Sequence, residues 1–152
     1  MDAIELLREK GGEIVDKATD AITGRHLGHY ENAKPAQTRE RFETLCGLTL
    51  ECLVTKSAIP MIKYAEKIAQ QRFSSGFSLR EVQTAFNVLE ESIWDKILGE
   101  MQPNEYADAV ALVNTVLRIG KESVARTYFS FVSKSKVPSL DLKAHFTGTE
   151  IT

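Results

Sequence analysis

The chain has 152 residues, of which 43% are hydrophobic and 26% are charged, so its length suits one domain with one core. Nineteen basic residues against twenty-one acidic ones give a formal net charge of -2, which leaves no basic surplus for binding nucleic-acid phosphates. No run of eighteen apolar residues occurs, and the first residues lack the basic start of a signal peptide. We therefore expect a cytoplasmic protein that binds neither nucleic acid nor membranes.

The first predicted helix covers residues 2–22, where apolar residues recur at steps of three and four. Gly11 and Gly12 interrupt it, and each glycine costs a helix interior about 1 kcal/mol relative to alanine. We therefore expect either a kink or two shorter helices at this point. The polar segment 24–34 follows and predicts a connection between helices.

The second predicted helix covers residues 35–55. It combines Pro35, which suits a first helical turn, with an apolar stripe. It also contains both cysteines, Cys46 and Cys52, whose spacing places them on different faces of a helix and too far apart for a disulfide. We expect both to be reduced, half-buried thiols at the core.

The third helix is expected to begin at a Ser57 cap, with Pro60 in its first turn, and to end at the sequence SSGF. Arg72 in its last turn predicts a favourable interaction with the helix dipole, and an anion contact beside the next helix is the alternative. Gly76 suits the left-handed position that follows many helix ends.

The fourth helix has the clearest start signal in the sequence. Ser78 and Glu81 have the spacing of a capping box, in which each side chain accepts a hydrogen bond from the other residue's backbone N–H. Phe77 and Val82 stand at the positions of a hydrophobic staple around this box. An apolar stripe then continues around Trp94, the only tryptophan of the chain.

The last helix is expected to start at Pro103 and Asn104 and to continue for about thirty residues, or roughly 45 Å. Beyond Lys136 the helical pattern fails, and we expect residues 135–152 to form an extended or disordered tail. Residues 1–134 thus predict a single all-α domain, a bundle of five or six helices.

Side chains with the potential for chemistry are few. His26 and His29 are spaced as metal ligands often are, and Glu31 follows them, so a metal-binding protein or an enzyme is one alternative. This segment contains two glycines and looks exposed, which favours ordinary surface histidines and no metal site. No phosphate loop, nucleotide fingerprint, EF-hand loop or cysteine cluster occurs. We therefore expect a protein that is not an enzyme, with no catalytic residue and no cofactor.

Apolar residues give two further sets of candidates. Aromatic residues at helical spacing usually fill a core, but four of them are candidates for the lining of a ligand pocket: Phe86, Trp94, Tyr106 and Tyr128. The last helix is apolar over more turns than one small domain easily covers, which favours a homodimer. The candidates for the dimer interface are Val113, Leu117, Val124 and Phe131.

A resemblance to a known family is carried by the sequence KYAEKIAQQRFSSGFSLREVQTAFNVLEESIWDKIL. It resembles the N-terminal domain of the RsbT co-antagonist family, the RsbR-type sensor modules of bacterial stressosomes. The family pattern is a helix ending in arginine, a short break with glycine, an aromatic or apolar residue, Ser/Thr-Leu-x-Glu-Val and later a bulky residue. The residues at these places are Arg72, Gly76, Phe77, Ser78, Leu79, Glu81, Val82 and Trp94. The sequences YENAKPAQTRERFETLCGLTLECL and VNTVLRIGKESVARTYF are similar to the family's second and terminal helices.

The resemblance implies a globin-like, haem-free, dimeric module that senses an input and relays it to an attached or partner domain. The sequence supports the haem-free part, because no histidine lies between Tyr30 and Ala144 to serve as a proximal ligand. Such modules usually precede a phosphorylatable output domain. This chain ends soon after its last helix, so we expect a stand-alone relative or a fragment, and the output role is not carried over.

The leading hypothesis is therefore a non-catalytic sensory or regulatory module in a bacterial stress response. It would relay a signal to an unidentified signalling protein through helix packing or dimer rearrangement. The first alternative is a metal-binding helical protein or enzyme that uses His26, His29 and Glu31, which metal analysis would reveal. The second is a structural adaptor that binds no ligand.

Overall fold

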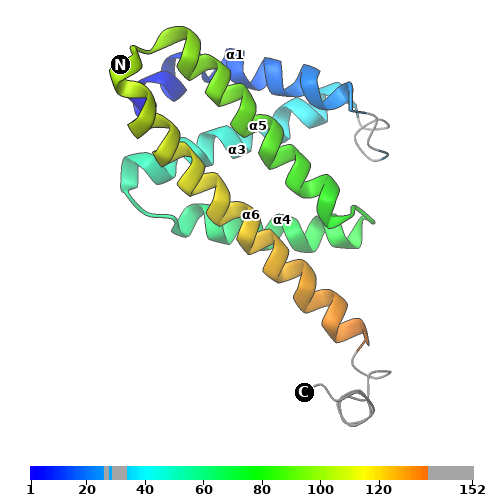
Figure 1. Cartoon of the computed structure of the whole chain (residues 1–152). Coiled ribbons are helices and arrows are strands. Elements are labelled where there is room, and N and C mark those ends of the chain that lie inside the picture. The colour runs from blue at the N-terminus through cyan, green and yellow to red at the C-terminus, as the bar shows by residue number, and fades with distance from the viewer. Residues whose placement is uncertain (26–27, 29–33, 137–152) are drawn as a thin grey trace, which may run out of the picture.

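The structure is a computed structural model that describes residues 1–25, 28 and 34–136. Almost all of these residues lie in helices. Within these residues the chain forms five α-helices and one short 3-10 helix, and no strand (Figure 1). In chain order they are α1 (Ala3–Thr23), α3 (Pro35–Thr55), α4 (Ile59–Ser74), α5 (Leu79–Glu100), η1 (Pro103–Glu105) and α6 (Tyr106–Lys136). The predicted all-α bundle of five or six helices is confirmed.

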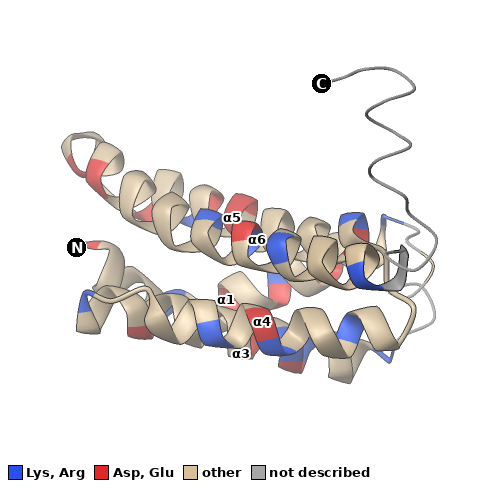
Figure 2. Cartoon of the chain, turned by 90° about the horizontal axis from the view of Figure 1, so that it is seen from below, with Lys and Arg blue, Asp and Glu red and all other residues tan. Residues whose placement is uncertain are grey.

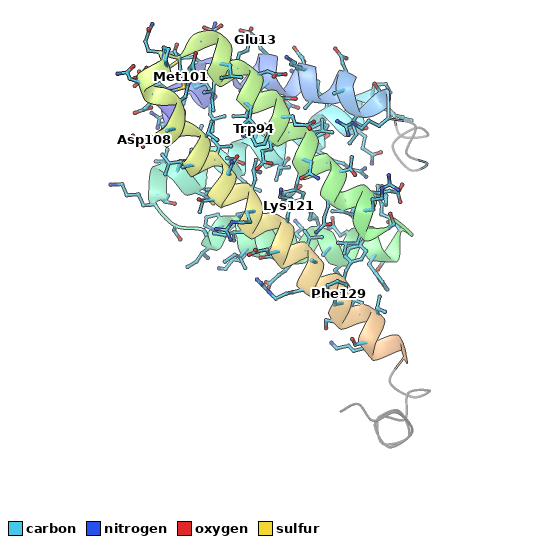
Figure 3. All side chains as sticks on the ribbon, in the orientation of Figure 1. Glu13, Trp94, Met101, Asp108, Lys121 and Phe129 are labelled. Atoms are coloured by element: carbon cyan, nitrogen blue, oxygen red, sulfur yellow. The ribbon has the colours of Figure 1, made fainter. Side chains whose placement is uncertain are left out.

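The helices stack in two layers. α5 and α6 form one layer, which covers α1, α3 and α4 in the other (Figure 2). The most extensive packing joins α4 to α6, α1 to α3, α1 to α5 and α5 to α6. Figure 3 shows the side chains on the helices, and the buried apolar ones form the core. The largest fully buried ones are Phe86, Leu6, Ile14, Ile22, Met61, Leu89, Ile93, Ile97, Leu117, Val82, Val88 and Val113.

α1 is continuous through Gly11 and Gly12, so the expected division into two shorter helices is wrong. Buried apolar residues lie on both sides of the glycines, and burying one such side chain contributes about 1.5–3 kcal/mol, more than a glycine costs. The helix also has a start signal that the sequence analysis missed. Asp2 and Glu5 form a capping box, in which the Asp2 carboxylate accepts the backbone N–H of Glu5 at 2.9 Å.

α3 has the bounds that the sequence predicts, from Pro35 to Thr55. Its C-cap residue is Lys56, whose φ of 56° lies in the left-handed region that residues other than glycine rarely adopt. α4 then begins at Ile59 with Ala58 as its N-cap residue, so the predicted Ser57 cap is misplaced by one position. The Ser57 hydroxyl still accepts the backbone N–H of Ile59 at 3.2 Å.

α4 ends in a Schellman motif that fixes the direction of the chain toward α5. Gly76 adopts φ 86°, the left-handed conformation that the sequence predicts for it. Its N–H donates to the carbonyl of Phe73 at 3.1 Å, and the N–H of Phe77 donates to the carbonyl of Arg72 at 2.9 Å. Arg72 lies in the last turn of α4, as expected.

α5 starts with the predicted capping box. The Ser78 hydroxyl accepts the backbone N–H of Glu81 at 3.1 Å, and the Glu81 carboxylate accepts the backbone N–H of Ser78 at 2.8 Å. Phe77 and Val82, the two staple positions, are both buried. The cap therefore holds Phe77 in the core at the start of α5.

α6 approaches α4 and α5 closely at Gly120, which is buried in the middle of the helix. A Cβ atom at this position would lie 2.7 Å from Cε2 of Phe86 and 3.0 Å from Sδ of Met61. Any side chain here would therefore push α6 away from its neighbours or displace the Phe86 ring.

The C-terminal turns of α6 extend beyond the rest of the bundle (Figure 1). Phe129 lies on this extension and is 63% exposed (Figure 3). Across the part of the chain that the structure describes, no helix is both long enough and apolar enough to span a membrane.

Ion pairs join α1 to its neighbours at the surface. Lys96 of α5 contacts Glu13 of α1 at 2.7 Å, and Lys17 of α1 contacts Asp95 of α5 at 2.8 Å. The hydrogen bond from Lys96 is the main reason that the pKa of Glu13 is lowered. Solvent screens such exposed pairs, so they contribute little to the stability of the fold.

Candidate functional site

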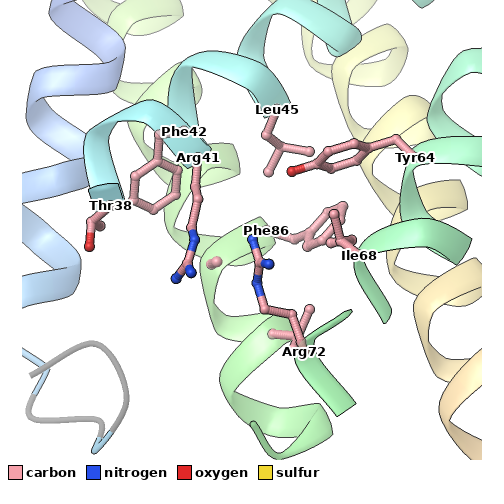
Figure 4. A pocket seen from close by; sticks show the side chains of 10 residues that line it. Thr38, Arg41, Phe42, Leu45, Tyr64, Ile68, Arg72 and Phe86 are labelled. Carbon is pink, nitrogen blue, oxygen red and sulfur yellow. The ribbon is translucent and has the colours of Figure 1, made fainter. Parts of the chain in front are cut away.

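A pocket with an apolar interior lies between α3, α4 and the first turns of α5 (Figure 4). Its inner cavity has a volume of about 30 Å³. The apolar residues of its wall are Phe42, Leu45, Ile68, Val82, Ala85 and Phe86. The polar residues at its edge are Thr38, Arg41, Tyr64 and Arg72.

A wider and more polar basin of about 440 Å³ adjoins this cavity on the α3 and α4 side. Arg41, Tyr64, Ile68 and Arg72 line both spaces, so the basin is the outer part of the same pocket. The remaining residues of the basin are polar or charged: Gln37, Glu40, Thr44, Lys67 and Gln71.

Helical spacing explains why these residues meet. Thr38, Arg41 and Leu45 lie at steps of three and four on one face of α3. Tyr64 and Arg72 lie two helical turns apart on one face of α4, with Ile68 between them. Figure 4 shows the guanidinium groups of Arg41 and Arg72 directed into the same region from these two helices.

Both guanidinium groups lie near the ring of Phe77. The distance from Cζ to the ring centroid is 5.6 Å for Arg41 and 5.8 Å for Arg72, within the range of cation–π attraction. The backbone of Phe77 is held as well, because its carbonyl accepts the hydroxyl of Tyr128 at 2.9 Å. The ring therefore provides a fixed support for two cations at the pocket.

Tyr64 contributes a neutral hydroxyl to the pocket. Burial raises the pKa of this phenol, and the positive charges of Arg72 and Arg41 partly oppose that shift. The hydroxyl is therefore protonated at neutral pH. It makes no hydrogen bond to any residue that the structure describes, so its proton is available to a bound acceptor.

The model of one protein family, described as RsbT co-antagonist protein rsbRD N-terminal domain, matches residues 12–130, most of the chain. The chain belongs to this family. The resemblance seen in the sequence is thereby confirmed, and the domain is one of a family of regulatory domains. No curated protein and no solved structure matches the chain. The expected likeness to the globin fold stays a prediction.

The central motif of this RsbT co-antagonist domain surrounds the pocket. Arg72 lies at the pocket, Gly76 makes the turn, and Phe77 supports the two guanidinium groups. Ser78 and Glu81 then start α5, which supplies the third wall. The motif thus sets the position of the wall formed by α5 relative to the end of α4.

Of the four aromatic residues predicted to line a pocket in this RsbT co-antagonist domain, Phe86 lines the pocket between α3, α4 and α5, and the other three lie outside it. Trp94 is half-buried and donates its Nε1–H to Oδ1 of Asn114 at 2.8 Å, which links α5 to α6. Tyr106 donates its hydroxyl to the carbonyl of Leu98 at 3.3 Å. Tyr128 is buried against Phe77 instead of lining the cavity.

The residues predicted for the dimer interface face inward. Val113, Leu117 and Val124 are fully buried in the core of this chain, so they are not available to a second copy in this conformation. Phe131 is half-buried, and its ring centroid lies 5.1 Å from that of Phe73. An apolar stripe on the sequence does not distinguish a core face from a dimer face, which explains the choice of these residues.

His26, His29 and Glu31, the residues of the metal-binding alternative, lie outside the described residues, as do positions 137–152 of the expected tail. Over residues 1–25, 28 and 34–136, no group of three histidine, cysteine or acidic side chains could hold a metal ion. Cys46 and Cys52 are both free, as expected, and both are buried where half-burial was predicted. Burial raises the pKa of the Cys46 thiol to about 11, which makes it a poor nucleophile at neutral pH.

Arg41 and Tyr64 are pocket residues that no sequence pattern predicted. Arg41 adjoins an apolar stripe of α3, where a long charged side chain is usually a solvated neighbour of the core. The available signal was an arginine next to the buried Thr38 and Phe42 on the same face. Its significance depends on Arg72, which lies on another helix, and that proximity is not encoded in any local spacing.

Proposed function

We propose that this domain is a non-catalytic regulatory module of a bacterial stress-signalling assembly, acting in the cytoplasm on a protein partner. The observation that carries the proposal is the family match over residues 12–130. The inferred role is to take up an input at the pocket and to relay it to α6 as a change in helix packing. Such a relay needs two arrangements of the helices that the input favours unequally.

Phe86 is the residue through which the pocket would communicate with α6. Its side chain lines the inner cavity. The same ring occupies the space that a Cβ atom at Gly120 would need. A change in the position of this ring would therefore change how α6 packs against α5. α6 is the helix that projects beyond the bundle (Figure 1).

The proposed module also forms a homodimer, with the exposed apolar residues near the end of α6 as its interface. Phe129 is 63% exposed, and Val132 and Phe73 are each 36% exposed. These side chains lie on or beside the turns of α6 that project from the bundle, and a second copy of the same surface would cover them.

The regulatory role is tested by changing the chromosomal gene in the organism that encodes the chain. Deletion of the gene should change the induction of stress-response transcripts after a mild stress, and Gly120→Ala should change it in part. Gly12→Ala is the matched control, because nothing lies within 4 Å of a Cβ at that position. A response unaffected by the deletion would contradict the proposed function.

A further inference from the structure

We propose that the pocket between α3, α4 and α5 binds a small amphiphilic carboxylate. Its head group would lie on the guanidinium groups of Arg41 and Arg72, and the end of its short aliphatic tail would enter the inner cavity. As a binding site, the pocket is inferred from its own geometry and charge. As the input site of a signalling domain, it rests on the proposed function.

The charges around the pocket favour an anion. Among the described residues that line its two parts, Arg41, Lys67 and Arg72 are cationic and Glu40 alone is acidic. Arg72 forms no ion pair with any described residue, and its guanidinium lies 5.8 Å from the centroid of the Phe77 ring. A guanidinium group presents parallel N–H donors that match the two oxygens of a carboxylate. This cationic site belongs to a chain whose formal net charge is -2.

The inner cavity favours a short apolar tail on that anion. Its wall beyond the arginines consists of aliphatic and aromatic side chains, with Phe86 and Val82 buried on α5 and Leu45 on α3. The volume of about 30 Å³ is well below the roughly 150 Å³ of a cavity that takes up benzene. On that scale the inner cavity holds about one carbon, so it takes up the end of a short aliphatic tail and excludes an aromatic ring.

Tyr64 adds a hydrogen-bond donor at the boundary between the two parts of the pocket. Its side chain lines both the apolar cavity and the polar basin. The neutral hydroxyl has a proton to donate and no described partner for it. Together with the two guanidinium groups, it discriminates between a carboxylate, which only accepts hydrogen bonds, and an amine or ammonium group of the same size.

The probe for this site is butyrate, titrated into the full chain by isothermal calorimetry. 1-Butanol has the same number of carbons without the charge, acetate has the charge with a shorter tail, and butylammonium reverses the charge. We expect butyrate to bind at least about tenfold more tightly than any of these three. Equal or weaker binding of butyrate than of butanol, or no binding of butyrate, would overturn the inference.

Variants of the chain separate the head-group site from the tail site. Arg72→Gln should weaken butyrate binding by about tenfold or more, since it removes one of the paired guanidinium groups. Arg80→Gln makes the same change in net charge at an exposed position that lines neither part of the pocket, and it should change the affinity by less than about twofold. Equal losses in the two variants would show an effect of net charge alone and would overturn the site.

Ala85→Val tests the cavity without touching a charge. The two added carbons should fill the inner space, so the affinity for butyrate should fall to that for acetate while acetate binding stays unchanged. Circular dichroism melts of each variant verify that it is folded. Wild-type affinity for butyrate in a folded Ala85→Val variant would overturn the placement of the tail. If butyrate binds but the packing of α6 does not change, the proposed relay is contradicted, whereas the inferred binding site is supported.

Discussion

Gly120 is the residue at which the absence of a side chain matters most. Replacing it with alanine would favour the helix by about 1 kcal/mol through propensity, but the new Cβ would overlap the Phe86 ring and contact Met61 closely. Overpacking of this kind costs about 1–3 kcal/mol, so it outweighs the gain. The position therefore fixes the distance between α6 and its two neighbours.

We expect Gly120→Ala to lower the free energy of unfolding by about 1 kcal/mol in urea denaturation. Gly12→Ala is the control, since it lies in a helix interior with open space around its Cβ, and it should raise stability by about 0.5–1 kcal/mol. Equal stabilisation by the two substitutions would show that α6 does not approach Phe86 so closely.

The raised pKa of the Tyr128 hydroxyl predicts that the fold loses stability at high pH. Burial is the main cause that raises the pKa of its hydroxyl to about 12, from an unperturbed value near 10. Below pH 10 the phenol is protonated in the folded and the unfolded chain, and its contribution to stability is complete. Between pH 10 and 12 the unfolded chain loses this proton first, so the contribution is lost as pH rises.

We expect Tyr128→Phe to lower stability at pH 7 by about 1 kcal/mol, because the hydrogen bond to the Phe77 carbonyl is removed. The variant should lose less further stability than the wild type between pH 10 and 12. Denaturation curves at a series of pH values measure both effects. Parallel stability curves over that interval would show that Tyr128 ionises equally easily in both states.

At the scale of the helices, local signals were sufficient where they lie next to each other in the chain. Pro35 and the Ser78–Glu81 pair predicted the starts of α3 and α5, and Gly76 predicted the turn before α5. The continuity of α1 was not predicted, because the free energy gained by packing its apolar face outweighs the cost of two glycines in the helix. Most residues of the pocket, Phe86 excepted, were not predicted, because apolar stripes show which face of a helix is buried but not which helix covers it.

The start of α5 is a suitable place to measure one of these local signals. Ser78→Ala should lower the free energy of unfolding by about 1 kcal/mol, because the backbone N–H of Glu81 loses its acceptor. Ser74→Ala, at an exposed position near the end of α4, should change it by less than about 0.5 kcal/mol. Thermal or urea denaturation distinguishes the two, and no loss in Ser78→Ala would mean that the cap is not formed in solution.

At the scale of the whole molecule, the exposed Phe129 near the end of α6 predicts the oligomeric state. Size-exclusion chromatography with light scattering should give a dimer at micromolar concentration. Phe129→Glu should give a folded monomer, since Phe129 is exposed and its charge would fall within the proposed interface. Leu98→Glu, at a residue of α5 that is 59% exposed, should remain dimeric. A wild-type monomer at high micromolar concentration would contradict the dimer.

Relay between the pocket and α6 is tested most directly by amide NMR spectra of the wild type and Gly120→Ala, with Gly12→Ala as control. Because Phe86 contacts the position of Gly120 and also lines the pocket, Gly120→Ala should shift the signals of pocket residues such as Leu45 and Ile68. Gly12→Ala should leave those signals in place. Changes confined to α6 and its immediate contacts would show that the pocket and α6 respond independently, which contradicts a relay through helix packing.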